Sequence, residues 1–232
     1  GNSICSVSVP MNNYLESNSV SGASWYSTQA CINADSVAVQ NILTANNVTG
    51  FTVNQLAAFD STEGVPKRIT RLLLINMGLT TLEGIGDLAE LTVLKLHTNN
   101  IDTLPHEFFN LTKLDTLFLQ SNAIRVIPQA ISTLSAIRKL DLGMNQLTAL
   151  PESFWNLINL EWVNLERNSL TSISSSVGNL QKVANLLLSE NEITTLPDEI
   201  TTLPFINSSG DIRIYNNKLC SVNASINAFL TA

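Results

Sequence analysis

Apolar residues recur along this chain with a fixed period between Leu91 and Ile193. Each unit reads L-x-x-L-x-L-x-x-N-x-L and is followed by a short polar segment. The asparagines lie 23 residues apart, at Asn99, Asn122, Asn145, Asn168 and Asn191, and Asn217 has the same place in a last partial unit. A period of this size means that each unit buries its apolar side only by stacking on its neighbours. The pattern therefore predicts a repeat protein.

Within each unit, apolar and variable residues alternate over a short stretch, as in Leu94-Lys95-Leu96. Alternation predicts one short strand per unit, with leucines on one face and variable residues on the other. Because the chain must return to the same side before the next strand begins, the strands are expected to be parallel. The asparagine follows the strand, where its amide can bond backbone groups that would otherwise be buried unpaired. We therefore interpret these asparagines as structural residues rather than ligand contacts.

The return segment of most units contains a Leu-Pro or Ile-Pro pair, such as Leu104-Pro105 and Leu150-Pro151, whereas Ile173-Ser174 is an exception. Proline cannot continue a strand, but it favours an extended or helix-starting turn. The apolar residues that follow are expected to pack inward as core residues, not as a cofactor site. They are Phe108, Ile131, Phe154, Val177 and Ile200.

This arrangement of leucines and asparagines resembles the leucine-rich-repeat family over residues 69–219, and six positions agree in each unit. The resemblance implies an α/β solenoid, a right-handed curved superhelix with a parallel β-sheet on its concave face and a helical N-terminal cap. It also implies that the asparagine side chains form a continuous ladder. The regular Leu-Pro repeats and the acidic, Asn-rich cap look like those of extracellular bacterial proteins, although plant-type repeats end similarly.

The chain divides into three predicted segments. Residues 1–68 form an N-terminal capping region of helix, loop and helix, in which Asn33 or Asp35 can cap the second helix. Residues 69–219 hold about seven repeats, of which the first is atypical and the last is partial. The last unit begins three residues later than the 23-residue period requires, which predicts a bulged loop between Leu203 and Asp211. Residues 220–232 begin a C-terminal capping helix, which we expect to be truncated.

The two ends of the chain resemble each other. Residues 2–7 align with residues 217–222 without a gap, at a constant offset of 215. We expect from this match that the chain is a piece of a longer protein built from repeated modules. The alternative is that both ends independently carry a similar capping helix.

Composition argues against several kinds of partner. The net charge is −7 and charged residues make up 13% of the chain, so it offers no concentration of Lys and Arg for nucleic acid or anionic lipid. No apolar run approaches the roughly 20 residues that span a bilayer. We therefore expect no nucleic-acid partner, no membrane insertion and a monomer.

Three cysteines bear on the cellular compartment. Cys5 and Cys31 flank a compact polar segment, and we predict a disulfide between them, with free buried thiols as the alternative. A disulfide implies an oxidising compartment, so we expect a secreted or extracellular-surface protein. Cys220 is then the odd cysteine, and we expect its partner further along a parent chain.

No arrangement of residues predicts catalysis. The two histidines, His97 and His106, accompany no cysteine pair at metal-ligand spacing, and the sequence has no phosphate loop or nucleophile motif. Asp141 and Glu166 lie on adjacent units and imitate a glycosidase pair. Without a cleft to raise one pKa, we interpret both as solvated surface charges. We therefore predict no enzyme, no cofactor and no metal site.

The variable strand positions form columns on the expected concave face. Most are polar, but Phe118 and Trp162 are expected to project to solvent with Met144 nearby. Large exposed aromatic residues are enriched among those that dominate binding energy. The alternative is that the rings only pack on the stems of Lys95 or Lys139. The predicted ligand-binding residues are Lys95, His97, Phe118, Gln120, Asp141, Met144, Trp162, Asn164 and Glu166.

These observations lead to one main functional hypothesis and two alternatives. We expect a non-catalytic recognition module that binds a protein ligand through the concave face, because a rigid sheet lets its side chains vary without harming the core. One alternative is a structural or adhesive spacer in a tandem array, which the matching chain ends support. The other is a carbohydrate-binding surface protein, since aromatic faces beside Asp, Asn, Gln and Glu suit sugars.

Overall fold

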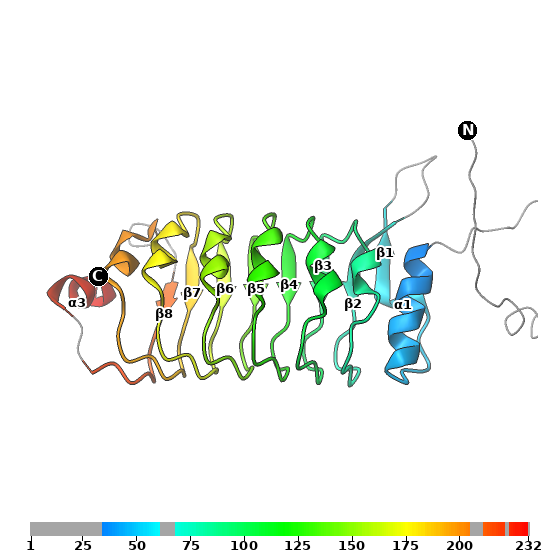
Figure 1. The fold of residues 1–232 in the computed structure, drawn as a ribbon, viewed down its shortest axis with the longest axis horizontal. Coiled ribbons are helices and arrows are strands. Elements are labelled where there is room, and N and C mark those ends of the chain that lie inside the picture. Colours follow the sequence, from blue (N-terminus) through cyan, green and yellow to red (C-terminus); the bar gives the residue numbers. More distant parts are fainter. Residues whose placement is uncertain (1–33, 61–67, 205–210, 221–222, 232) are drawn as a thin grey trace, which may run out of the picture. The chain divides into compact units, whose positions relative to one another are not determined.

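The strands of successive repeats form one open sheet in chain order. The computed structural model describes residues 34–60, 68–204, 211–220 and 223–231. Strands β2 to β8 pair in parallel, each with the next along the chain (Figure 1), which confirms the predicted parallel sheet and the solenoid. These strands are β2 (Ile69–Leu73), β3 (Val93–Lys95), β4 (Thr116–Phe118), β5 (Lys139–Asp141), β6 (Trp162–Asn164), β7 (Asn185–Leu187) and β8 (Asp211–Arg213).

One further strand, β1 (Ala57–Phe59), was not predicted from the sequence. It follows the short helix α2 (Val53–Leu56) and pairs antiparallel with β2, with Ala58 opposite Arg71. An unpaired edge of a sheet exposes backbone donors and acceptors to other chains. β1 therefore covers the edge of β2 on the N-terminal side of the repeats.

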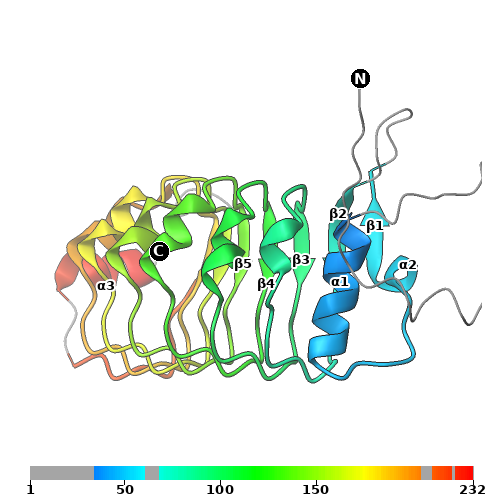
Figure 2. The ribbon, with the colours of Figure 1, turned by 45° about the vertical axis from the view of Figure 1, so that its right-hand side comes forward.

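The return segments form short 3-10 helices, which make a second row beside the strands (Figure 2). A proline with φ between −65° and −74° precedes η3, η4, η5 and η7, so its fixed dihedral sets the start of each turn. At η6, Ser174 replaces the proline, and its side chain accepts a hydrogen bond from the Ser176 amide. The helices are η2 (Ile85–Asp87), η3 (His106–Asn110), η4 (Gln129–Thr133), η5 (Glu152–Asn156), η6 (Ser175–Asn179) and η7 (Asp198–Thr202).

The core lies between the strands and the 3-10 helices. The central residue of each strand from β3 to β7 is buried. Each 3-10 helix from η3 to η7 also buries an apolar residue, three positions after the proline or Ser174 that precedes the helix. Burying one such side chain contributes about 1.5–3 kcal/mol relative to leaving it in water. The inward packing predicted for the return segments is confirmed, since Phe108, Ile131, Phe154, Val177 and Ile200 are at most 1% exposed.

Each ladder asparagine joins two successive repeats through its side-chain amide. The Nδ2 of Asn145 donates to the carbonyl of Leu119 in the preceding repeat (3.1 Å) and to those of Leu142 (3.0 Å) and Gly143 (3.2 Å). Its Oδ1 accepts from the amide of Ile124 at 3.0 Å. The same kind of bonds recurs at Asn99, Asn122, Asn168, Asn191 and Asn217.

The residue before each ladder position adopts a left-handed backbone conformation. Glycine and asparagine tolerate this region best, whereas a β-branched side chain clashes with its own backbone there. Thr98 is the β-branched member of the set, so its turn is the most strained. These residues have φ between 54° and 61°, and they are Asn76, Thr98, Ser121, Met144, Arg167, Glu190 and Asn216.

We expect Thr98→Asn to raise the free energy of unfolding by about 1 kcal/mol, because it relieves this strain. Asparagine already fills the same position at Asn76 and Asn216. Urea denaturation of the two proteins measures the difference. Thr103→Asn is the matched control, since Thr103 is exposed and lies outside the left-handed set. Equal stability of Thr98→Asn and the unmodified chain would contradict the strain argument.

A helix packs at each end of the described repeats. α1 (Ala34–Ala45) contacts η2, and α3 (Ala224–Thr231) contacts η7. The buried carboxylate of Asp35 ties α1 to β2, because it accepts from Nε of Arg68 (2.9 Å) and from the amide of Ile69 (2.7 Å). At α3, Oδ1 of Asn223 accepts from the Ile226 amide at 2.8 Å, as an N-cap does.

Some predictions fall outside the described residues. The Cys5–Cys31 disulfide lies in residues 1–33, and most of the bulged loop lies in residues 205–210. The division into residues 1–68, 69–219 and 220–232 stays a prediction. Cys220 is exposed with a free thiol.

Candidate functional site

The outward-facing residues of the strands form columns across the sheet. The parallel register sets Phe118 beside Asp141 and Asp141 beside Asn164, and it sets Lys139 beside Trp162. Each neighbour on the sheet is therefore the corresponding residue of the next repeat. We call this outward surface of β2 to β8, with the residues just past the strands, the sheet face.

Two aromatic rings pack together on the sheet face. The ring centroids of Phe118 and Trp162 lie 6.1 Å apart with their planes at 46°, and Nζ of Lys95 lies 5.1 Å from the Phe118 centroid. Both rings lie on the outward face and are half-buried. They are half-buried because they shield each other and Lys95 covers Phe118 as a cation–π partner.

A shallow hollow lies beside these rings, and we call it the aromatic hollow. It has a volume of about 360 Å³. Its wall combines two aromatic faces with one carboxylate, one amine and one amide, so it can accept an apolar group and hydrogen-bond the rim of that group. The lining residues are Phe118, Lys139, Glu161, Trp162, Ala184 and Asn185.

Asp141 is buried, and the prediction that it is a solvated surface charge is wrong. Asp141 is only 6% exposed, because Phe118 and Asn164 flank it in the same column. Burial raises the pKa of Asp141 to about 6, and the negative charge of Glu166 also raises it. Hydrogen bonds from the Gly143 amide (3.0 Å) and the Asn164 side chain oppose the rise only in part. The site therefore holds a carboxyl group that titrates close to neutral pH.

Gly143 makes room for this arrangement. A Cβ atom at this position would lie 2.8 Å from Nδ2 of Asn164, which is closer than real Cβ contacts. Asn164 would then have to move away from Asp141. The one sequence signal for this contact is that Gly143 stands in a column otherwise made of His97, Gln120, Glu166, Ser189 and Tyr215.

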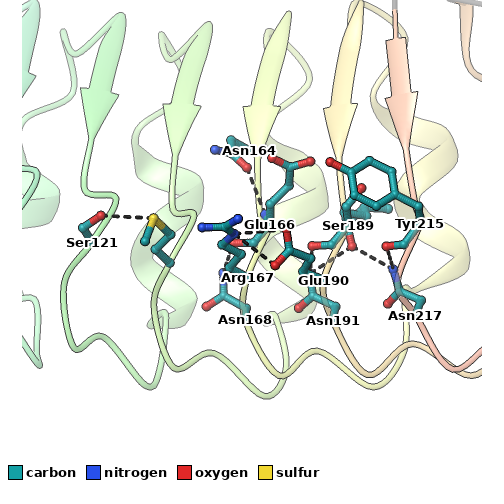
Figure 3. Close-up of polar contacts among 12 residues, drawn as sticks. Ser121, Asn164, Glu166, Arg167, Asn168, Ser189, Glu190, Asn191, Tyr215 and Asn217 are labelled. Atoms are coloured by element: carbon teal, nitrogen blue, oxygen red, sulfur yellow. Dashed lines mark hydrogen bonds and ion pairs between the residues drawn. The ribbon is translucent and has the colours of Figure 1, made fainter.

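A second hollow lies just past the carboxyl ends of β4 to β8, and we call it the polar hollow. It has a volume of about 260 Å³, and Figure 3 shows Glu166, Ser189 and Tyr215 in a row at its strands. Arg167 and Glu190 form an ion pair of 3.1 Å at its rim. The lining residues are Gln120, Gly143, Met144, Asn164, Glu166, Arg167, Glu190 and Tyr215.

The predicted ligand-binding residues divide between the two hollows. Phe118 and Trp162 line the aromatic hollow, whereas Met144 lines the polar hollow rather than joining the rings. Lys95 lies over Phe118, and the nearby His97 lines neither hollow. Burial, together with the charge of Lys95, lowers the pKa of His97. The residues that line the polar hollow also include Gln120, Asn164 and Glu166. Asp141 lies in the column between Phe118 and Asn164.

Sequence reasoning missed several lining residues of both hollows. Glu161 and Ala184 come one position before a strand, so the alternation did not assign them to the sheet face. Arg167 and Glu190 occupy the left-handed turn positions, where their side chains rejoin the same surface. The sequence did contain a signal for the Arg167–Glu190 ion pair, because these opposite charges are 23 residues apart and therefore lie on neighbouring repeats.

The described residues give no sign of a metal site or a membrane-spanning helix. Within residues 34–60, 68–204, 211–220 and 223–231, no three His, Cys, Asp or Glu side chains gather as metal ligands. In the same ranges, every helix is too short or too polar to cross a bilayer.

Comparison with known proteins agrees with the fold. A family model described as "Leucine rich repeat" matches residues 68–124, 89–147 and 119–170. A search of curated protein sequences gave no match. The matches to the family model overlap and follow one another along the central repeats.

Several solved structures resemble this chain. An LRR protein from Leptospira interrogans is 26% identical, with a TM-score of 0.52 over 66% of this chain and 44% of its own. PEPR1–AtPEP1 is 27% identical, with a TM-score of 0.67 over 84% and 30%. The LRR ectodomain of the receptor kinase SOBIR1 from Arabidopsis thaliana is 23% identical, with a TM-score of 0.56 over 80% and 96%. The chain thus spans less than half the length of the first two proteins.

Sequence period, strand register and family model lead to one assignment. The asparagine ladder recurs in every described repeat from β3 onward, and the family model covers the repeats that carry Asn99, Asn122, Asn145 and Asn168. The fold supports a protein-interaction module in general, and proteins of this type are typically non-catalytic. Over residues 68–170, the chain consists of repeats of the leucine-rich-repeat family.

Proposed function

We propose that this chain is a secreted or cell-surface recognition module that binds a protein ligand through the sheet face, centred on the aromatic hollow. The observation that carries the proposal is the Phe118–Trp162 pair beside an open hollow of about 360 Å³. Trp residues dominate binding energies because they bury a large rigid surface with little loss of conformational entropy.

Position and rigidity support this choice. Phe118 and Trp162 extend from strands whose central residues, Leu117 and Val163, are fully buried in the core. The rings are therefore held in place before a ligand arrives, which reduces the entropy lost on binding. PEPR1–AtPEP1, a structure of the same fold, pairs a receptor with a peptide. That example supports a peptide segment as the kind of ligand to test first.

The test uses a displayed library of random peptides, selected for binding to the 232-residue chain. We expect Trp162→Ala to weaken the selected peptides about thirtyfold or more, which corresponds to the loss of a dominant contact. Phe118→Ala should weaken the same peptides, because the rings support each other. Isothermal titration calorimetry gives the dissociation constants, and melting temperatures confirm that each variant is folded.

Ile158→Ala is the matched control, because Ile158 is 55% exposed and follows η5 on the side of the 3-10 helices. It removes an exposed apolar side chain away from the sheet face, so peptide binding should stay unchanged. Failure to select any binding peptide would overturn the proposal. Selected peptides that bind Trp162→Ala as tightly as the unmodified chain would also overturn it.

A further inference from the structure

Two residues that line the polar hollow carry side-chain oxygens without hydrogen-bond partners, and so does their neighbour Ser189. Oε1 of Gln120, Oε1 of Glu166 and Oγ of Ser189 are buried, and none of them has a partner among the described residues. Ser189 is 0% exposed and stands between Glu166 and Tyr215 (Figure 3). An unsatisfied buried polar atom destabilises a fold by about 1–3 kcal/mol, so three in one place call for an explanation.

Asn164, Arg167 and Glu190, which also line this hollow, already have partners. Oδ1 of Asn164 accepts from the Glu166 amide at 2.9 Å, and the Asn164 side chain also bonds Asp141. Arg167 is paired with Glu190, and its Nε lies 3.1 Å from a carboxylate oxygen. The unpartnered side-chain oxygens of the lining residues, on Gln120 and Glu166, are acceptors. A ligand group rich in N–H donors would satisfy them.

The charges around the hollow favour a cation. Glu166, Glu190 and Arg167 line it, and Asp141 and Arg213 lie close enough to Glu166 to interact with its charge, so three carboxylates face two guanidinium groups. Arg213 is engaged by Asp211 and Arg167 by Glu190, so Glu166 is the carboxylate with a free buried oxygen. A surplus of negative potential in a hollow raises the local concentration of cationic groups.

The walls suit a long basic side chain. Met144 and Tyr215 are 48% and 55% exposed, although both are large and largely apolar. A lysine or arginine buries its aliphatic stem against such surfaces while its charged end hydrogen-bonds elsewhere. The planar guanidinium of arginine also stacks on an aromatic ring and bonds a carboxylate with two N–H groups. A volume of about 260 Å³ is enough for one side chain of this kind.

We propose that the polar hollow is a second subsite, which binds the charged end of an arginine or lysine side chain of the protein ligand through Glu166 and Gln120. This proposal rests on the function proposed above and adds the chemistry of the partner. The ligand then places an apolar side chain in the aromatic hollow and a basic one in the polar hollow.

The test titrates the 15N-labelled chain with N-acetylarginine amide and with N-acetylcitrulline amide, which has nearly the same shape but no charge. We expect the arginine probe to shift the amide signals of Gly143, Glu166, Arg167 and Ser189. The citrulline probe should bind about tenfold more weakly, because a hydrogen bond to a charged group is lost. Glu166→Gln should weaken the arginine probe by a similar factor.

Glu90→Gln is the matched control, because it also removes one carboxylate, at an exposed ion pair with Lys113 far from the hollow. It should leave the binding of the arginine probe unchanged. Equal binding of the two probes, no binding of arginine, or undiminished binding to Glu166→Gln would each overturn the subsite. So would methyl α-D-glucopyranoside shifting these signals when arginine does not, since that outcome assigns the hollow to a neutral sugar.

The two proposals fail separately. If arginine does not bind while selected peptides still depend on Trp162, the aromatic hollow stands and the basic subsite is wrong. If arginine binds through Glu166 while no peptide depends on Trp162, the polar hollow is a site by itself and the proposed function is wrong.

Discussion

Replacing Asn145 by alanine is expected to lower the free energy of unfolding by about 3–5 kcal/mol. The amide of Asn145 bonds three carbonyls and one N–H, and the residue is 9% exposed. Alanine removes all four bonds and leaves the buried Ile124 amide without a partner, whereas the carbonyls of Leu119, Leu142 and Gly143 each keep one other donor. Urea denaturation followed by circular dichroism measures the loss.

Two further variants define what the amide contributes. Asn156→Ala is the control, since Asn156 is an exposed asparagine at the end of η5, and it should change stability by less than about 0.5 kcal/mol. Asn145→Asp keeps an acceptor for the Ile124 amide but turns a carboxylate toward carbonyl oxygens. We expect it to be at least as destabilising as alanine. A small loss in both Asn145 variants would show that the ladder bonds do not hold the repeats together.

Asp141→Asn is expected to stabilise the protein at pH 7, by about 1–3 kcal/mol. The pKa of Asp141 is raised to about 6 from an ordinary value of 3.8, so the folded protein holds its proton more tightly than the unfolded chain does. The stability that this carboxyl group contributes is therefore fully present below about pH 4, and it is lost as pH rises through about 6. Asparagine has no proton to lose, and its Oδ1 still accepts from the Gly143 amide.

The geometry of the neighbouring repeat supports this substitution. Asn164, the residue beside Asp141 on the next strand, already bonds the Glu166 amide as Asp141 bonds that of Gly143. Denaturation midpoints between pH 3.5 and 7.5 measure the effect, and the fall in stability between about pH 4 and 6 should shrink in Asp141→Asn. Asp102→Asn, at an exposed aspartate, should keep the pH dependence of the unmodified chain. An unchanged slope in Asp141→Asn would mean that another group titrates in this range.

Most of the repeat architecture could be predicted because it depends on the same residues in every unit. A leucine between two variable residues makes a strand with one buried face, and an asparagine after it bonds the turn of the preceding repeat. The edge strand β1 could not be predicted, because it lies before the repeats and its pairing with β2 depends on the chain doubling back. Strands β3 to β8 are equally short, but their alternation recurs in every unit and can therefore be recognised.

The candidate site could be predicted only as a surface. Alternation placed Phe118, Trp162 and Asp141 on the outward face, which the register confirms. It gave no information about how they cover one another, because the neighbours of Asp141 on the sheet lie 23 residues away on either side (141 − 118 and 164 − 141). Whether a carboxylate is solvated depends on the size of those neighbours. Asp141 was therefore misjudged as exposed.

Sequence alone defined the 23-residue period, the face that each strand turns outward and the asparagines that close each turn. These follow from which side chains every unit must bury and which backbone groups it must satisfy. Tertiary structure decided the burial and raised pKa of Asp141, the pairing of Phe118 with Trp162, and the division of the surface into an aromatic and a polar hollow. Those properties arise when parallel register brings particular side chains of successive repeats together, and their sizes and charges then determine what each hollow can bind.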